Sequence, residues 1–224
     1  MDPLSTLVSL EGVPSAYAAA RDGIDVMLRD RGLRRTSPEM TAESLLRGAH
    51  ASAVLEGSSP APVRVSTELL GLGPALVSAP LQALARIHAL AAAGLPAEQR
   101  GRPRDAEAAD RLRGVGDLLT AATVAPALMV AAVVHAELAT AAPFPSHNGI
   151  VARAAERLVL VGRGVDAKSL VVPEAGHLAL RAAYESNLRG YRDGGQPGVH
   201  SWLLYAAEAY AAGAEASPLR RSAH

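Results

Sequence analysis

The chain has 224 residues, which is enough for one domain with a sizeable hydrophobic core. Its 22 Lys and Arg residues balance its 22 Asp and Glu residues, so net charge does not indicate a nucleic acid or an anionic membrane as partner. The absence of cysteine excludes disulfides, thiolate catalysis and cysteine-ligated zinc. Hydrophobic residues make up 49% but aromatic residues only 3%, so a core of Ala, Leu and Val is expected, which favours an all-α fold.

The first part of the chain predicts an N-terminal helical arm over residues 1–35, followed by a helix and linker over 36–65. The N-terminus lacks the basic region of a signal peptide, so we expect a cytoplasmic protein. A helical patch spans 16–28 within the arm. Ser37-Pro38 is a typical helix start, with serine as cap and proline at the first position. That helix is expected to run to Glu56, where Gly57 supplies a left-handed stop and SSPAPVRV follows as linker.

Residues 66–216 are expected to form the helical core, with a flexible tail over 217–224. The pattern over 66–93 is helical but interrupted by glycine and proline, which predicts two pieces, and 105–119 predicts an amphipathic helix. Residues 126–141 are apolar on all sides, as in a central buried helix. The longest apolar run, 124–134, is too short to span a bilayer. Later helices are expected over 150–161, 173–189 and 199–212, with RDGGQPG as a loop and a short apolar segment at 169–172.

The stretch AAPFPSHNGIVAR, residues 141–153, has the features of an anion-binding loop. Asn148-Gly149 precedes a helix expected to begin near Ile150, and we expect the backbone N–H groups of residues 148–151 to point outward. The first N–H groups of a helix have no partners within it, and the helix dipole is positive there. Glycine lets the backbone approach a ligand closely. An Asn-Gly pair before a helix is also an ordinary turn and cap, so both interpretations stay open.

The longer stretch HAELATAAPFPSHNGIVAR resembles the core of the Fic/DOC family, whose motif runs H-P-F-x-[D/E]-G-N-G-R-x-x-R. The positions that match are Pro143, Phe144, Asn148, Gly149 and Arg153, with His135 at a histidine commonly found upstream. The resemblance covers roughly residues 41–214. It implies a Fic-like helical domain with a central buried helix, related to enzymes that transfer AMP, or another phosphate-containing group, from a nucleotide to a protein hydroxyl.

Four motif positions depart from the family. Its catalytic histidine is Ala142, its magnesium-binding acid is Ser146, its first arginine is Ile150 and its first glycine is His147. Loss of a general base alone costs about 10²–10⁴ in rate. The resemblance therefore implies that ordinary AMP transfer is severely impaired or absent and that the Mg²⁺ site is lost. The alternative is an active, atypical nucleotidyl or phosphoryl transferase or hydrolase that uses His147, which otherwise is an exposed loop histidine.

A second resemblance lies in Ser52–Gly57, SAVLEG, which fits the inhibitory pattern [S/T]-x-x-x-E-[G/N] of Fic proteins. It implies that Glu56 reaches Arg153 and blocks productive ATP binding. An acid at a helix C-terminus costs roughly 0.3–1 kcal/mol against the dipole, which suggests a tertiary partner. The simpler interpretation is that Glu56 is solvated and Arg153 pairs with Glu156.

These features predict a module that binds ATP, another nucleotide or phosphate through Asn148, Gly149 and Arg153, or that binds a protein target. No nucleic acid, membrane or metal partner is expected, and the Ala-rich faces fit a homodimer contact and core packing equally well. His135 is expected to be buried and hydrogen-bonded, while the remaining histidines show no metal-ligand spacing: His50, His88, His177 and His200. The basic residues of the loop before residue 105 lie where the family carries a target-docking flap, and solvation is their simplest interpretation: Arg100, Arg102 and Arg104.

Overall fold

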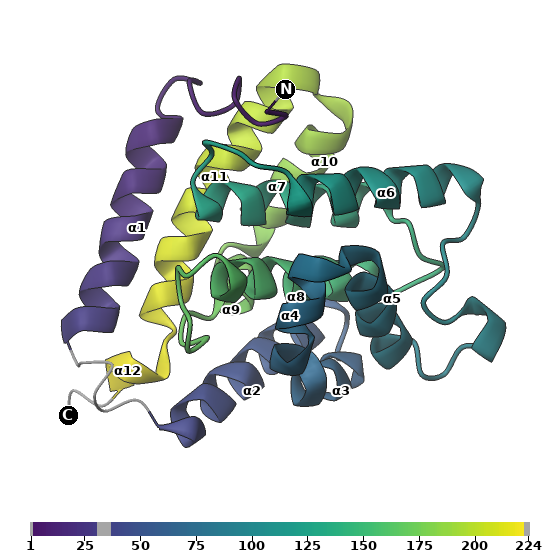
Figure 1. Ribbon diagram of the computed structural model, residues 1–224. Coiled ribbons are helices and arrows are strands. Elements are labelled where there is room, and N and C mark those ends of the chain that lie inside the picture. Colours follow the sequence, from purple (N-terminus) through teal and green to yellow (C-terminus); the bar gives the residue numbers. More distant parts are fainter. Residues whose placement is uncertain (1, 31–36, 222–224) are drawn as a thin grey trace.

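The computed structural model describes residues 2–30 and 37–221, and all regular structure in these two ranges is helical (Figure 1). The all-α class expected from the composition is therefore confirmed. At the centre, α7 (Ala127–Ala141) packs along α8 (Asn148–Gly162), as the apolar patterns predicted. Within the described residues, no helix is both long enough and apolar enough to cross a bilayer.

The N-terminal helix α1 (Val13–Asp30) lies along the long C-terminal helix α11 (Gly195–Glu215), at the left of Figure 1. Tyr17 and Ile24 of α1 are fully buried. The predicted arm is thus part of the same core, although its last residues, 31–35, and residue 36 lie outside the described residues.

The predicted helix that carries Glu56 is present as α2 (Pro38–Leu55), with Ser37 as its N-cap and Glu56 as its C-cap. The expected linker after it is wrong in part, since α3 (Ala61–Glu68) begins within it. Pro60 and Pro62 lie at the start of that helix, where proline is tolerated because the first N–H groups have no helical partner. The broken stretch that follows contains η2 (Leu69–Leu72), α4 (Gly73–Ser78) and α5 (Pro80–Ala91), one piece more than predicted.

A loop containing the short turn η3 (Ala97–Gln99) leads to α6 (Ala106–Thr120), whose N-cap Asp105 accepts a hydrogen bond from the backbone of Ala108 at 2.7 Å. The C-terminal part comprises α9 (Pro173–Ala179), α10 (Arg181–Asp193), α11 and α12 (Pro218–Arg221). The expected RDGGQPG loop is wrong, because only Gly194 separates α10 from α11. The expected tail is also wrong up to residue 221, since Leu219 of α12 is buried.

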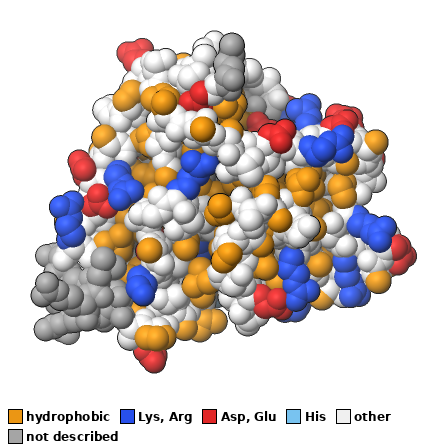
Figure 2. Space-filling model, in the orientation of Figure 1, with side chains coloured by type: hydrophobic (Ala, Val, Ile, Leu, Met, Phe, Trp, Pro, Cys, Tyr) orange, Lys and Arg blue, Asp and Glu red, His pale blue; other side chains and the backbone are white. Residues whose placement is uncertain are grey.

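The packing around α7 explains why its sequence is apolar on every side. Helices α6, α8, α10 and α11 all contact it, and the indole of Trp202 on α11 donates a hydrogen bond to the carbonyl of Ala132 at 2.9 Å. The surface is different in character. On the face drawn in Figure 2, positive and negative side chains are interspersed, in keeping with the balanced composition.

Candidate functional site

The loop between α7 and α8 is closed by Asn148. Its side-chain carbonyl accepts a hydrogen bond from the backbone N–H of Phe144 at 2.8 Å, and its amide donates to the carbonyl of Phe144 at 2.9 Å. Ala142, at the end of α7, has left-handed backbone angles with φ 44°. The side chain of Asn148 thus shapes the loop, and its backbone N–H belongs to the first turn of α8.

Helix α8 begins two residues earlier than its apolar pattern predicted. His147 is its N-cap, with φ 57°, and its carbonyl accepts the N–H of Val151 at 3.1 Å. The expectation that Val151 presents its N–H outward is therefore wrong. His147 is also not exposed: it is half-buried, and its Nδ1 lies 2.6 Å from the hydroxyl of Ser146.

The basic loop before α6 is tied to this site. The ring of His88 stacks on Phe144, with centroids 4.4 Å apart, and its Nδ1 accepts the N–H of Gly101 at 2.8 Å. Burial lowers the pKa of His88 from 6.5 to about 4, so its ring is a neutral acceptor at pH 7. Arg104 binds the loop directly, because its N–H donates to the carbonyl of Pro143 at 2.9 Å and its guanidinium donates to the carbonyl of Ala142. The side chain of Arg104 is still 45% exposed, as the solvated interpretation expected, so Arg104 both contacts the loop and faces solvent.

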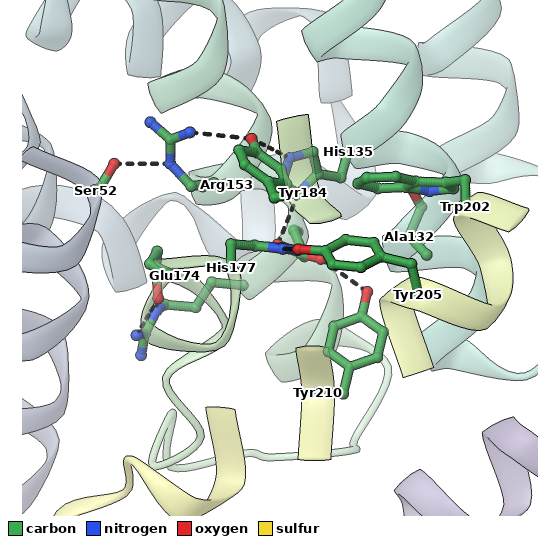
Figure 3. Close-up of polar contacts among 12 residues, drawn as sticks. Ser52, Ala132, His135, Arg153, Glu174, His177, Tyr184, Trp202, Tyr205 and Tyr210 are labelled. Atoms are coloured by element: carbon green, nitrogen blue, oxygen red, sulfur yellow. Dashed lines mark hydrogen bonds and ion pairs between the residues drawn. The ribbon is translucent and has the colours of Figure 1, made fainter. Parts of the chain in front are cut away.

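Glu56 and Arg153 form the ion pair that the sequence predicted. Glu56 Oε1 lies 2.6 Å from Arg153 Nη2, and the side chain of Arg153 is 2% exposed against 28% for Glu56. The hydroxyl of Ser52, one turn earlier on α2, accepts a hydrogen bond from Arg153 Nε at 2.9 Å (Figure 3). Gly57 has φ 69° and ends the helix in the left-handed conformation, as expected. The pairing of Arg153 with Glu156 that was considered as an alternative is not formed.

The carboxylate of Glu56 lies directly against the first turn of α8. A Cβ atom added to Gly149 would overlap Glu56 Oε1, so only glycine allows this approach without a shift. The positive end of the α8 dipole favours a negative group at this position. The structure thus places a carboxylate where the sequence predicted an anion.

Behind Arg153, a chain of hydrogen bonds leads into the core (Figure 3). Arg153 Nη1 donates to the hydroxyl of Tyr184 at 3.1 Å, and that hydroxyl lies 3.0 Å from His135 Nε2. The other ring nitrogen of His135, Nδ1, lies 2.8 Å from Glu156 Oε2. His135 is therefore buried and hydrogen-bonded, as predicted.

Glu156 is the centre of this network. Its Oε2 also lies 2.9 Å from His177 Nε2, and its Oε1 accepts the hydroxyl of Tyr210 at 2.9 Å. Burial raises the pKa of Glu156, but the charge interactions and hydrogen bonds of the two histidines outweigh burial and lower it below its usual 4.5. Burial lowers the pKa of His135 from 6.5 to about 4, against the opposite effect of Glu156. At pH 7 a neutral His135 therefore contacts an ionised Glu156.

A second buried pair anchors α2. Arg157 and Glu174 form two hydrogen bonds, of 2.9 and 2.6 Å, and Arg157 also donates to Ser44 of α2 at 3.1 Å. Gly48 lets α2 approach them, because a Cβ there would lie 2.5 Å from Arg157 Nη2. The position of the helix that carries Glu56 is thus fixed near its middle.

No protein-family model and no curated protein matches this chain. The interpretation of the site therefore depends on its residues and their contacts. Sequence reasoning did not find the core residues of the network, which come from four different helices: Glu156, His177, Tyr184, Tyr205 and Tyr210. The available signal was the group of charged residues inside the apolar pattern of α8: Arg153, Glu156 and Arg157.

Proposed function

We propose that this chain is a Fic-type protein that binds the phosphate groups of a nucleotide such as ATP at the start of α8, without ordinary AMP transfer. The observation that supports this most directly is the position of Glu56 between Arg153 and Gly149. Carboxylate and phosphate oxygens are both negatively charged acceptors, and both bind a guanidinium and the free N–H groups at a helix start. A site that accommodates one is chemically suited to the other.

The proposed binding requires Glu56 to leave. Arg153 is 2% exposed, and a cavity of about 20 Å³ beside it, between α2, α3 and α8, has room for about one water molecule. Phosphate and carboxylate therefore compete for one arginine. Glu56 acts as an internal inhibitor in this proposal, with Ser52 and Gly57 holding the end of its helix.

The loop lacks the groups that AMP transfer needs. Ala142 has no side chain that accepts a proton, and Ile150 is buried where the family motif has a phosphate-binding arginine. A proton acceptor and a cationic clamp act on the same transition state. Their combined loss leaves binding as the proposed function, directed to a nucleotide or to a protein target.

One observation favours a second candidate function. The hydroxyl of Ser146 lies 2.6 Å from His147 Nδ1, next to the start of α8. A serine paired with a histidine is the arrangement that activates a hydroxyl as a nucleophile. An atypical transferase or hydrolase would use this pair on a phosphate held by Arg153.

Incubation with labelled ATP and Mg²⁺ separates the two candidates. A binding protein retains nucleotide, once Glu56 is replaced, without label transfer or turnover. Robust transfer or hydrolysis by the native chain, abolished by His147→Ala, would replace the first candidate with the second. Absence of nucleotide binding in both the native chain and Glu56→Gly would remove both.

A further inference from the structure

Three side chains with metal-binding atoms converge in the core beneath the loop. His135 comes from α7, Glu156 from α8 and His177 from α9, and all three are fully buried. Glu156 Oε2 lies 2.8 Å from His135 Nδ1 and 2.9 Å from His177 Nε2, and the three ligand atoms lie within 4.8 Å of one another. Two imidazoles and one carboxylate are a ligand set of zinc and of non-haem iron.

The polar atoms of these residues that do not face the shared centre contact tyrosine hydroxyl groups. His135 Nε2 lies 3.0 Å from the hydroxyl of Tyr184, and His177 Nδ1 lies 2.8 Å from that of Tyr205. Tyr210 holds the second oxygen of Glu156. Metal-binding histidines usually have such a partner on the other ring nitrogen, because it fixes the ring orientation and the tautomer.

Glu156 has no arginine or lysine in contact among the described residues. Arg153 is paired with Glu56, and Arg157 with Glu174. The hydroxyl of Tyr17 is buried near Glu156 and has no hydrogen-bond partner within the described ranges. A carboxylate in a closed core is costly to ionise unless it is paired, and a divalent ion bound to it lowers that cost.

We propose that His135, Glu156 and His177 bind a divalent transition-metal ion, with zinc as the natural probe. In a tetrahedral zinc site, ligands at about 2.1 Å from the metal lie about 3.4 Å apart, so each ring nitrogen moves about 0.5 Å away from the carboxylate oxygen when the ion enters. The ion bonds to the inner ring nitrogens, and the ring hydrogens move to the outer nitrogens that face Tyr184 and Tyr205. It cross-links α7, α8 and α9 directly behind Arg153.

The test uses the full chain without a metal-affinity tag. The protein is unfolded with denaturant and chelator, then refolded with Zn²⁺, with Co²⁺ or without metal, and its metal content is measured by mass spectrometry. We expect one ion per chain, a higher unfolding temperature with Zn²⁺, and visible Co²⁺ absorption, because metal binding is coupled to folding. His177→Gln and Glu156→Gln should retain less than about a tenth of an ion. His50→Gln, a substitution of an exposed histidine on α2, should bind as the native chain does.

If the variants fail to fold, the metal content of the native chain still tests the proposal. Refolded native protein with less than about a tenth of an ion per chain would show that Glu156 is held by hydrogen bonds only. One ion retained in both His177→Gln and Glu156→Gln would place the metal elsewhere. Neither outcome depends on nucleotide binding, so the proposed function and the metal site are tested separately.

Discussion

Glu56 and Arg153, 97 residues apart in the chain, meet at 2.6 Å where the end of α2 faces the start of α8. The contact places the carboxylate at the positive end of one helix dipole, although its own helix ends in a negative one. The dipole cost at the end of α2 is thus offset by α8 and by a buried guanidinium.

Replacement of Glu56 should tighten nucleotide binding. Glu56→Gly removes the competing carboxylate, so the affinity for ATP should rise roughly tenfold or more, the equivalent of about 1.4 kcal/mol. Isothermal titration calorimetry measures the change. Glu56→Gln should act in the same direction, because it removes the charge and keeps the shape, whereas Glu43→Gln, on the exposed side of α2, should not. Equal affinities of the native chain and Glu56→Gly would contradict the inhibitory role.

Replacement of Arg153 should weaken nucleotide binding in either background and should also destabilise the fold. Arg153→Ala leaves Ser52 and Tyr184 without their donor and opens space in a closed interface, so unfolding in urea should require roughly 2–4 kcal/mol less. Arg153→Lys keeps the charge but not the forked geometry, so its nucleotide affinity and stability should lie between those of the native chain and those of Arg153→Ala. Nucleotide binding that survives in a folded Arg153→Ala would disprove the site.

Restoration of the motif should return some AMP transfer. The combined change Ala142→His, Ser146→Asp, His147→Gly and Ile150→Arg supplies a proton acceptor, a metal ligand and a cation. Addition of Glu56→Gly should raise the activity further, since Glu56 lies against Gly149 in the native chain. Self-modification with labelled ATP is the readout, and the same chain without Ala142→His is the control. A folded, nucleotide-binding variant that transfers no label would show that more than the motif is missing.

Stability should fall between pH 6.5 and pH 4. His135 is neutral when folded because burial lowers its pKa from 6.5 to about 4, whereas the unfolded histidine takes up a proton below 6.5. The contribution of His135 to the free energy of unfolding, on the order of 3 kcal/mol, is therefore present above pH 6.5 and is lost as pH falls towards 4.

Urea unfolding of metal-free protein at several pH values measures this loss. His135→Gln should remove much of the dependence between pH 6.5 and 4, while His200→Gln, a change at a partly exposed histidine on α11, should leave it in place. A stability that is flat over this range would mean that His135 is protonated in the folded protein.

The sequence was sufficient for the parts of the fold where pattern and local chemistry agree. The apolar run of α7 and the Ser37-Pro38 start of α2 predicted their helices correctly. Helix α3 was missed because its prolines were interpreted as breakers, although proline at a first turn is compatible with a helix. Gly194 and its neighbours predicted a loop, but tertiary contacts between α10 and α11 keep nearly all of that segment helical.

The sequence likewise predicted one part of the candidate site and missed another. The contact between Glu56 and Arg153 was predictable because both lie in short patterns that resemble motifs of one family. The meeting of His135, Glu156 and His177 was not, because no spacing in the chain relates three residues whose proximity arises only when α7, α8 and α9 pack together. Their proximity is a property of the tertiary structure alone.

The anchoring of α2 near Gly48 sets the size of the motion that frees Arg153. Ser44 is bonded to Arg157, and the pair of Arg157 with Glu174 lies against Gly48, so the first half of the helix is held in place. Ser52 begins its last turn, about 6 Å along the helix axis beyond Gly48, and Glu56 is the C-cap, about 12 Å beyond Gly48 at about 1.5 Å per residue. Fraying of this single turn releases the carboxylate without any shift of the helix. Amide hydrogens near Glu56 should therefore exchange with solvent much faster than those near Gly48, and a bound anion should change only the former.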